Sequence, residues 1–123
     1  MARTSVPSPT PASHLPLTPA TFHVLMALAG GERHGYAIMK EVEAESGGDV
    51  RLGPGTLYGT LKRLLDAGLV DESGERGDES SDERRRYYRI TRLGMSVARA
   101  EARRLDGLVR AARQKKLITP EPA

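Results

Sequence analysis

The length and composition of the chain exclude several classes of protein. It has 123 residues, 38% hydrophobic and 28% charged, with no cysteine, no tryptophan and one phenylalanine. This length suffices for one domain with a modest core. The lack of cysteine excludes a disulfide framework and a thiolate metal site, and makes a reducing cytoplasm the expected location. No apolar run approaches the roughly 18 residues of a membrane span, so no membrane association is expected.

Charge is distributed unevenly along the chain. Between Glu32 and Glu83 there are 13 acidic and 6 basic residues, a net charge of −7. Between Arg84 and Lys116 there are 12 basic and 2 acidic residues, a net charge of +10. A basic segment beside an acidic one suggests a polyanionic partner for part of the surface. A solvated, charged helix would explain the same charge equally well.

The chain divides into four segments. Residues 1–16 hold four prolines among serine, threonine and alanine, and residues 117–123 form another proline-containing stretch. Neither can bury enough apolar surface to offset its ordering entropy, so both are expected to be disordered. Residues 17–91 are expected to form one folded domain, and residues 92–116 a final helix.

The first expected helix begins at Thr18, an N-cap residue followed by Pro19. It ends at Gly30–Gly31. The apolar residues between these signals recur at helical spacing and are expected to form one core face: Phe22, Leu25, Met26 and Ala29.

A second helix is expected after a turn at residues 30–33. Apolar residues such as Ile38 and Val42 mark it, and Gly47–Gly48 ends it. His34 stands at its entry without a partner acid nearby, so we expect a structural or a solvated side chain rather than a catalytic one.

The third helix is the most informative segment. Its apolar stripe consists of Leu57, Leu61, Leu64 and Leu65, and Gly68 is well placed as the left-handed residue after the helix. Its opposite face carries Thr56, Tyr58, Gly59, Thr60, Lys62 and Arg63. Hydroxyl, phenol and basic groups on one exposed face can hydrogen-bond base edges and phosphates. An ordinary solvated face is the alternative.

A β-hairpin is expected next. A short strand starts at Leu69–Val70, an acidic loop follows, and residues 84–91 form a second short strand with Tyr88 and Ile90 on one face. The acidic loop would repel phosphates at the hairpin tip. DNA contacts are therefore expected at the basic base of the hairpin: Arg84, Arg85 and Arg86. The resulting fold class is mainly α with a small β-hairpin, in the order of a winged helix-turn-helix domain.

The last helix begins at the cap residue Thr91 and carries a heptad seam. The seam consists of Met95, Ala98, Ala102, Leu105, Val109 and Ala112, and Leu108 is among the residues that widen it. A helix of about 25 residues extends roughly 37 Å, which is more than a small domain can cover. These residues are therefore expected to form a dimer interface. The alternative is that the stripe packs wholly on its own domain.

Three segments together resemble the PadR family of bacterial transcriptional regulators. They are FHVLMALAGGERHGYAIMKEVE, GPGTLYGTLKRLLDAGLV and RRRYYRITRLG. The resemblance runs from about Leu17 to Arg113, and the single final helix is similar to the short branch of the family.

The resemblance implies a homodimer whose last helices pack against the partner's domain. It also implies that the third helix enters the major groove of double-stranded DNA, while the wing lies along the backbone or minor groove. Thr56, Tyr58, Gly59, Lys62 and Arg63 fall on groove-facing positions. Tyr36 falls where such domains touch a phosphate, or it belongs to the core. Related repressors respond to phenolic acids or flat hydrophobic drugs near the dimer interface, so a small hydrophobic or aromatic effector is implied. Some drug-binding relatives hold their ligand in an aromatic clamp, and this chain has no tryptophan to form one.

The leading hypothesis is therefore a dimeric, sequence-specific DNA-binding repressor that reads an imperfect inverted repeat. The alternative is a winged-helix protein-interaction module without sequence-specific DNA binding. An enzyme is not expected, because no paired carboxylates, metal cluster or nucleophile with a base can be placed. The three histidines are too scattered for a zinc site, and no cofactor is expected.

Overall fold

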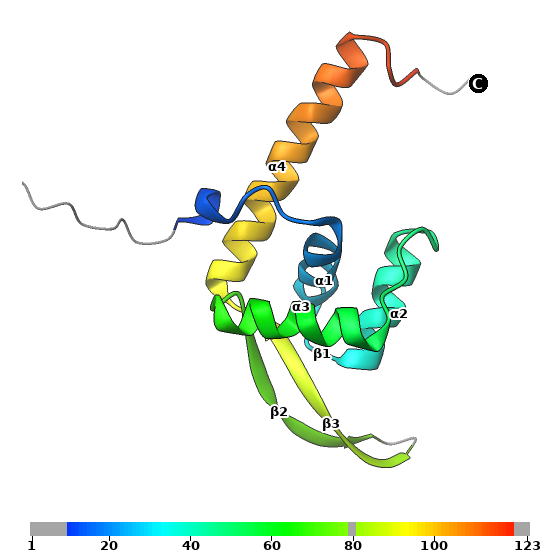
Figure 1. Ribbon diagram of the computed structural model, residues 1–123, viewed down its shortest axis with the longest axis vertical. Helices are drawn as coiled ribbons and strands as arrows, with labels where there is room; N and C mark the ends of the chain where they lie inside the picture. Colours follow the sequence, from blue (N-terminus) through cyan, green and yellow to red (C-terminus); the bar gives the residue numbers. More distant parts are fainter. Residues whose placement is uncertain (1–9, 79–80, 120–123) are drawn as a thin grey trace, which may run out of the picture.

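Three short α-helices, a β-hairpin and a long final α-helix are the main elements of the described fold (Figure 1). The computed structural model describes residues 10–78 and 81–119, and the side chains of all of these except 78 and 81–84. The elements in chain order are η1 (Pro11–His14), α1 (Pro19–Ala29), β1 (Arg33–His34), α2 (Gly35–Glu45), α3 (Pro54–Asp66), β2 (Val70–Asp78), β3 (Ser81–Ile90) and α4 (Arg92–Gln114). The expected order of three helices, a hairpin and a helix is confirmed.

Helix α1 begins where the sequence predicts but buries a different face. The Thr18 side chain accepts a hydrogen bond from the Thr21 backbone N–H at 3.2 Å, and a proline occupies the first turn. The buried residues are Val24, Leu25, Ala27 and Leu28, whereas Ala29 is exposed and Phe22 and Met26 are half-buried. The expected core face is thus wrong in part. The reason is that α1 packs against α2, α3, α4 and β3 together, which buries a sector that helical spacing alone does not identify.

Helix α2 is capped by a histidine rather than by a hydroxyl or carboxylate. His34 Nδ1 accepts a hydrogen bond from the Ala37 backbone N–H at 3.2 Å. Ile38 and Val42 are fully buried, as expected. Tyr36 is 52% exposed, so of the two places expected for it, the core is excluded.

The turn expected at residues 30–33 overlaps an additional strand, β1. Arg33 pairs with Tyr88 and His34 with Tyr87, which gives a three-stranded sheet in the order β1-β3-β2. A strand of two residues has no periodicity of its own, so only the partner strand reveals it. The pairing joins the start of α2 directly to the hairpin.

Helix α3 ends at a Schellman motif. The Leu69 N–H donates to the Leu64 carbonyl at 2.9 Å, and the Gly68 N–H donates to the Leu65 carbonyl at 3.1 Å. Gly68 has a φ of +76°, as its place in the sequence predicts. Thr60, expected on the exposed face, is instead buried, because it extends the leucine face of α3 towards the interior.

The hairpin is much longer than expected. Strands β2 and β3 take up most of the acidic segment that was expected to be a loop, and residues 79–80 lie outside the described part. Two register shifts interrupt the pairing, one of them between Glu72 and Gly74, where Gly74 has a φ of +119°. The expectation of two short strands with a flexible acidic loop is therefore wrong. Backbone pairing between the two strands orders a segment whose polar composition is typical of a loop.

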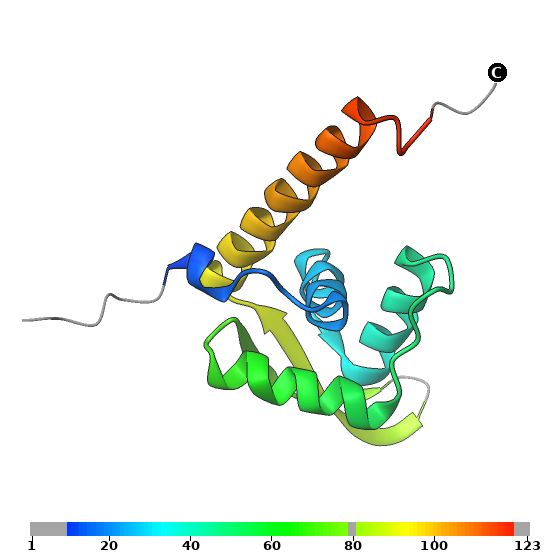
Figure 2. The same cartoon turned by 45° about the horizontal axis from the view of Figure 1, so that its top comes forward.

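Helix α4 is anchored at its start and projects at its end. Thr91 caps it by accepting from the Gly94 N–H at 3.0 Å, and Thr91 also donates to the Gly68 carbonyl at 2.7 Å. Gly94 is buried against the backbone of Leu69. In Figures 1 and 2 the C-terminal half of α4 extends away from the other helices, with no other described element beside it.

The described part of the leader, residues 10–16, is ordered, which corrects the expectation for that part. It contains η1, and Leu15 and Leu17 pack against the core. The Leu17 N–H donates to the Glu101 carboxylate of α4 at 2.9 Å, with Glu101 only 1% exposed. Residues 1–9 lie outside the described part. A buried carboxylate on α4 thus ties the segment before α1 to the final helix.

Candidate nucleic-acid interface

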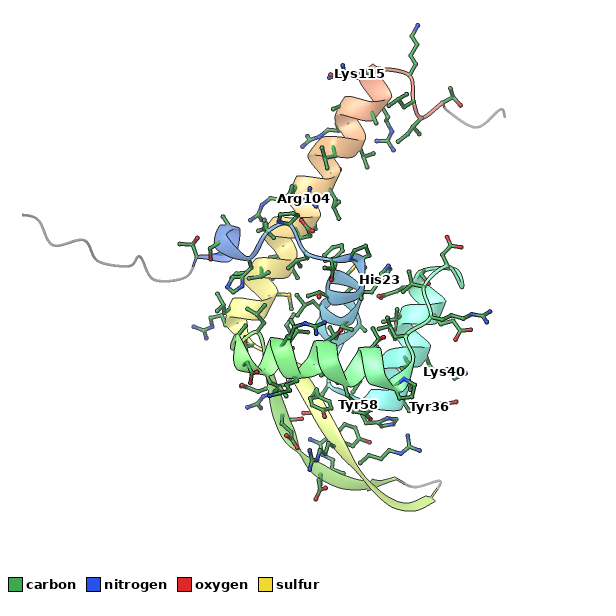
Figure 3. The ribbon with its side chains drawn as sticks, in the orientation of Figure 1. His23, Tyr36, Lys40, Tyr58, Arg104 and Lys115 are labelled. Atoms are coloured by element: carbon green, nitrogen blue, oxygen red, sulfur yellow. The ribbon has the colours of Figure 1, made fainter. Side chains whose placement is uncertain are left out.

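A hollow of about 530 Å³ opens where the start of α2, the first turns of α3 and the hairpin meet. Figure 3 shows the labelled residues Tyr36, Lys40 and Tyr58 gathered at this corner. The residues that line the hollow are His34, Gly35, Tyr36, Tyr58, Glu75, Arg85, Arg86 and Tyr88. Phenols and guanidinium groups, together with the N-terminus of a helix, give the corner several hydrogen-bond donors.

Two cations flank the ring of Tyr36. Lys40 Nζ lies 5.4 Å from the ring centroid, and the guanidinium carbon of Arg85 lies 5.7 Å from it. These are cation–π distances, so an exposed phenol here helps to hold two positive charges together. Lys40 comes from α2 and Arg85 from β3, so the cluster exists only in the folded protein.

His34 fastens the hairpin to α2. Its Nδ1 atom, which caps α2, also lies 3.3 Å from Arg85 Nη1. The ring of Tyr87 meets the His34 ring edge-on, with the centroids 5.3 Å apart. Both neighbours of Nδ1 are donors, so Nδ1 acts as the acceptor nitrogen of the ring. The role of His34 in this geometry is structural, which is one of the two roles expected for it.

The exposed face of α3 adds a second row of polar groups. Thr56, Lys62 and Arg63 are exposed, and Tyr58 is 49% exposed. Lys62 Nζ lies 3.5 Å from the Asp66 carboxylate, a surface ion pair that solvent screens strongly. Four of the five α3 residues predicted to face DNA therefore present their side chains to solvent.

Gly59, the fifth of these residues, has little to do with internal packing. A Cβ atom at this position would meet only the Arg63 guanidinium, at an ordinary contact distance of 3.7 Å. Nothing else within 4 Å in the described structure calls for a glycine here. At this position the α3 backbone is therefore not covered by a side chain on the outward face of the helix.

The wing arginines lie in the middle of the hairpin rather than at its base. Arg84 pairs with Gly77, Arg85 with Arg76, and Arg86 with Glu75. The prediction of a basic base is therefore wrong, because the strands extend beyond these residues in both directions. Arg85 and Arg86 line the hollow, and the side chain of Arg84 lies outside the described part.

Cross-strand pairing reduces the repulsion expected from the acidic wing. Arg86 lies 3.6 Å from Glu72, and Arg89 lies 4.0 Å from Asp71. Each pair sets an acid of β2 against an arginine of β3, so charges that are separate in the sequence partly cancel in the sheet. The acidic segment is thus a weaker barrier to a polyanion than its composition suggests.

Tyr88 forms the buried side of the hollow. Burial raises the pKa of its phenol, and the nearby Glu72 carboxylate raises it further. Tyr88 therefore remains a neutral phenol at physiological pH. The positive charge at this corner comes from Lys40, Arg85 and Arg86.

A comparison with family models decides the family. The model of the "Transcriptional regulator PadR-like family" matches residues 24–100, which include α2, α3, the hairpin and the first turns of α4. The chain belongs to the PadR-like family. The resemblance expected from its three motifs is confirmed.

Curated relatives of this PadR-family chain include a 37.1 kDa protein of a Streptomyces fradiae transposon, 44% identical over 89 residues. That match covers 70% of the chain and 24% of the transposon protein. Transcriptional regulator Rv3488 of Mycobacterium tuberculosis is 34% identical over 88 residues, covering 72% of the chain and 77% of Rv3488. A Lysinibacillus sphaericus relative is 31% identical, and the chain spans 63% of it. The chain thus spans less than two thirds of the Streptomyces and Lysinibacillus relatives.

Solved structures share the PadR fold. A PadR family regulator from Clostridium difficile superimposes with a TM-score of 0.65 at 23% identity, covering 77% of this chain and 95% of that one. Bacillus subtilis PadR in complex with operator DNA gives a TM-score of 0.57 at 20% identity, covering 88% of this chain and 51% of that one. These likenesses confirm the fold.

The residues predicted for a PadR dimer interface fall into two groups. Met95 is half-buried and Ala98 buried within the chain's own domain. The remaining five, which vary from half-buried to exposed, are Ala102, Leu105, Leu108, Val109 and Ala112. The alternative that the stripe packs wholly on its own domain is therefore excluded.

The sequence did not single out two residues of the corner, Lys40 and Gly35. Lys40 lies one helical turn after Tyr36, and this i, i+4 spacing in an aromatic–cation pair could have singled it out. Gly35 contributes through the contact of Tyr58 with its backbone, for which no signal exists in the local sequence. The described residues contain no cluster arranged to hold a metal ion, and none of their helices has both the length and the apolar content of a membrane span.

Proposed function

We propose that this chain is a sequence-specific DNA-binding transcriptional regulator that acts as a homodimeric repressor in the cytoplasm. The observation that carries the proposal is the convergence, at one corner, of Tyr58 from the α3 face, the cation-flanked Tyr36, and Arg85 and Arg86 of the wing. Family membership supports it, since the matching model describes transcriptional regulators. The Bacillus subtilis neighbour, solved with operator DNA, supports the same role for this fold.

In this proposal, α3 enters the major groove of double-stranded DNA. Thr56 and Tyr58 read base edges, because hydroxyl groups can both donate and accept. Lys62 and Arg63 neutralise phosphates. Gly59 allows the helix backbone to approach the groove wall, which agrees with the open space around it.

The corner at the start of α2 binds the phosphate backbone beside that groove. Tyr36, together with Lys40 and Arg85, offers a phenol and two cations to one or two phosphates. Arg84 and Arg86 extend this contact along the wing. Because Arg86 is already paired with Glu72 at an exposed site, exchanging that carboxylate for a phosphate costs little free energy.

A second copy of the chain covers the distal half of α4. Leu108 is 55% exposed and Val109 36% exposed, on a helix that extends beyond its own domain. Beside this stretch lies a hollow of about 380 Å³ lined mainly by apolar side chains, among them Phe22, Met26 and Leu105. An exposed apolar helix and an adjacent apolar hollow on the same chain are complementary surfaces for a symmetric dimer.

Two copies then present two α3 helices to one duplex. The operator is accordingly an imperfect inverted repeat with half-sites about 34 Å apart, one helical turn. The hollow beside α4 is also where a small hydrophobic effector would act, because a ligand there changes the surface on which the partner helix packs.

The test is selection of DNA fragments from a random-sequence library by the purified chain, followed by fluorescence anisotropy with the selected duplex. The proposal expects an inverted repeat, and binding at least about 1,000-fold tighter than to a scrambled duplex. Weak binding that is indifferent to sequence would instead favour the protein-interaction module and overturn the proposal. A thermal-shift screen against aromatic acids and hydrophobic drugs tests the effector.

A further inference from the structure

Gly35, the first residue of α2, lies directly against the ring of Tyr58 from α3. A Cβ atom at Gly35 would stand 2.4 Å from Tyr58 Oη and 2.9 Å from Tyr58 Cζ. Both distances are well inside van der Waals contact. Gly35 is buried, and the backbone fixes the direction in which a Cβ would point. Any residue larger than glycine at this position must therefore displace the phenol.

The backbone at Gly35 gives no other reason for a glycine. The residue belongs to an α-helix and is not among the glycines with a positive φ. Alanine is a better helix former than glycine. The packing of Tyr58 is thus the feature that requires a bare backbone at the start of α2.

We infer that Gly35 is a positioning residue for DNA reading, because it lets the Tyr58 phenol lie across the start of α2 in one orientation. The inference rests on the proposed function. Tyr58 is 49% exposed, so much of the side chain faces solvent while its hydroxyl end is supported by the start of α2. A side chain held in its binding orientation before DNA arrives loses less conformational entropy on binding. Because the contact joins α2 to α3, a change in the angle between these helices would shift the position at which the phenol meets the groove.

A comparison with Gly94 shows why this role is separable from folding. At Gly94 a Cβ atom would stand 2.0 Å from the backbone oxygen of Leu69, so the backbone itself would have to move. At Gly35 the obstructing atoms are the far end of one side chain, which can rotate into solvent. Gly35→Ala should therefore leave the fold intact and move Tyr58.

The experiment is a double-mutant cycle. It compares the wild-type chain with Gly35→Ala, Tyr58→Ala and the double variant, using anisotropy on the duplex selected by the wild type. Each single variant should weaken binding about tenfold, the lower range for a lost base contact. The double variant should bind as Tyr58→Ala does, because the alanine at 35 then has nothing to displace. Gly30→Ala, at the exposed end of α1, is the matched control and should bind as the wild type does, because a Cβ there would make only ordinary contacts of 3.4 Å with Arg33 Nη2 and 3.6 Å with the Ala27 carbonyl oxygen.

Two further readouts separate positioning from misfolding. The melting temperature of Gly35→Ala should stay within about 3 °C of the wild type. In NMR spectra, a nuclear Overhauser effect between the Gly35 Hα protons and the Tyr58 ring should be present in the wild type and absent in Gly35→Ala.

Three results would overturn the inference: wild-type affinity in Gly35→Ala, wild-type affinity in Tyr58→Ala, or a tenfold loss from Gly35→Ala that persists without Tyr58. A wild-type chain that shows no sequence preference is a different failure. It would remove the proposed function first, and the DNA role of Gly35 with it, whereas the Overhauser contact would still be observed.

Discussion

Replacing Glu101 by glutamine tests whether a buried carboxylate holds the segment before α1 on the final helix. Glu101 is 1% exposed and accepts three hydrogen bonds. The Leu17 N–H donates at 2.9 Å, Arg104 Nε at 2.5 Å and Arg104 Nη2 at 3.1 Å. Glutamine has nearly the same shape, but it has no charge and turns an N–H₂ group towards one of these donors.

The expected loss is about 2 kcal/mol in the free energy of unfolding, because hydrogen bonds to a charged group contribute roughly 1.5–3 kcal/mol. For a chain of this size, that loss lowers the melting temperature by roughly 8 °C. Urea unfolding at a fixed protomer concentration measures it, since dimerisation would make stability depend on concentration. Asp106→Asn is the matched control, because Asp106 is an exposed acid of α4 that pairs with Arg110 at 3.3 Å. Its replacement should change stability by no more than about 0.5 kcal/mol.

The same carboxylate predicts a pH dependence. The Arg104 guanidinium, assisted by the Leu17 N–H, holds the pKa of Glu101 below its ordinary value despite burial. A folded-state pKa below the unfolded value of about 4.3 means that the stabilisation is complete above that pH and is lost as pH falls through the folded pKa. The difference between wild type and Glu101→Gln should thus be constant from pH 7 to 5 and shrink below about 4.3. An equal difference at pH 7 and pH 3, or a variant as stable as Asp106→Asn, would refute the role.

Three further predictions concern DNA binding, assembly and folding. Lys62→Ala should weaken binding to all DNA sequences about equally and reduce the slope of log affinity against log salt by about 0.9 per protomer. Fluorescence anisotropy between 50 and 200 mM salt measures this slope. A changed sequence preference with an unchanged slope would contradict the assigned role of Lys62. Leu108→Glu should give a monomer in light scattering at micromolar concentration. The control Gln114→Glu adds a charge at another exposed position of the same helix and should remain a dimer. A wild-type chain that is itself a monomer would contradict the proposed dimer. Gly94→Ala should cost at least about 2 kcal/mol, because its Cβ would meet the Leu69 backbone oxygen at 2.0 Å; an unchanged urea midpoint would show that the backbone yields easily.

Local chemistry explains which features could be predicted from the sequence. The cap at Thr18, the left-handed Gly68 and the leucine stripe of α3 each depend on residues within about one or two helical turns. Their hydrogen bonds and spacing are properties of a short segment, so they survive whatever packs around it. Most of the α3 face proposed to meet DNA was predictable for the same reason.

Contacts between distant segments decided the rest. The sequence shows that Thr60 is polar and Ala29 is apolar. Only the neighbouring elements determine which face of each helix is buried, and they bury Thr60 and leave Ala29 exposed. The strand β1 and the length of the wing exist because β3 supplies hydrogen-bond partners far along the chain.

The sequence by itself thus determined the four α-helices, the presence of a hairpin, the order of these elements and the resemblance to the family. Only the tertiary structure placed Tyr36 between Lys40 and Arg85, and Tyr58 against Gly35. The physical reason is range: backbone capping and periodicity act over a few residues, whereas packing depends on which surfaces meet once the chain has folded.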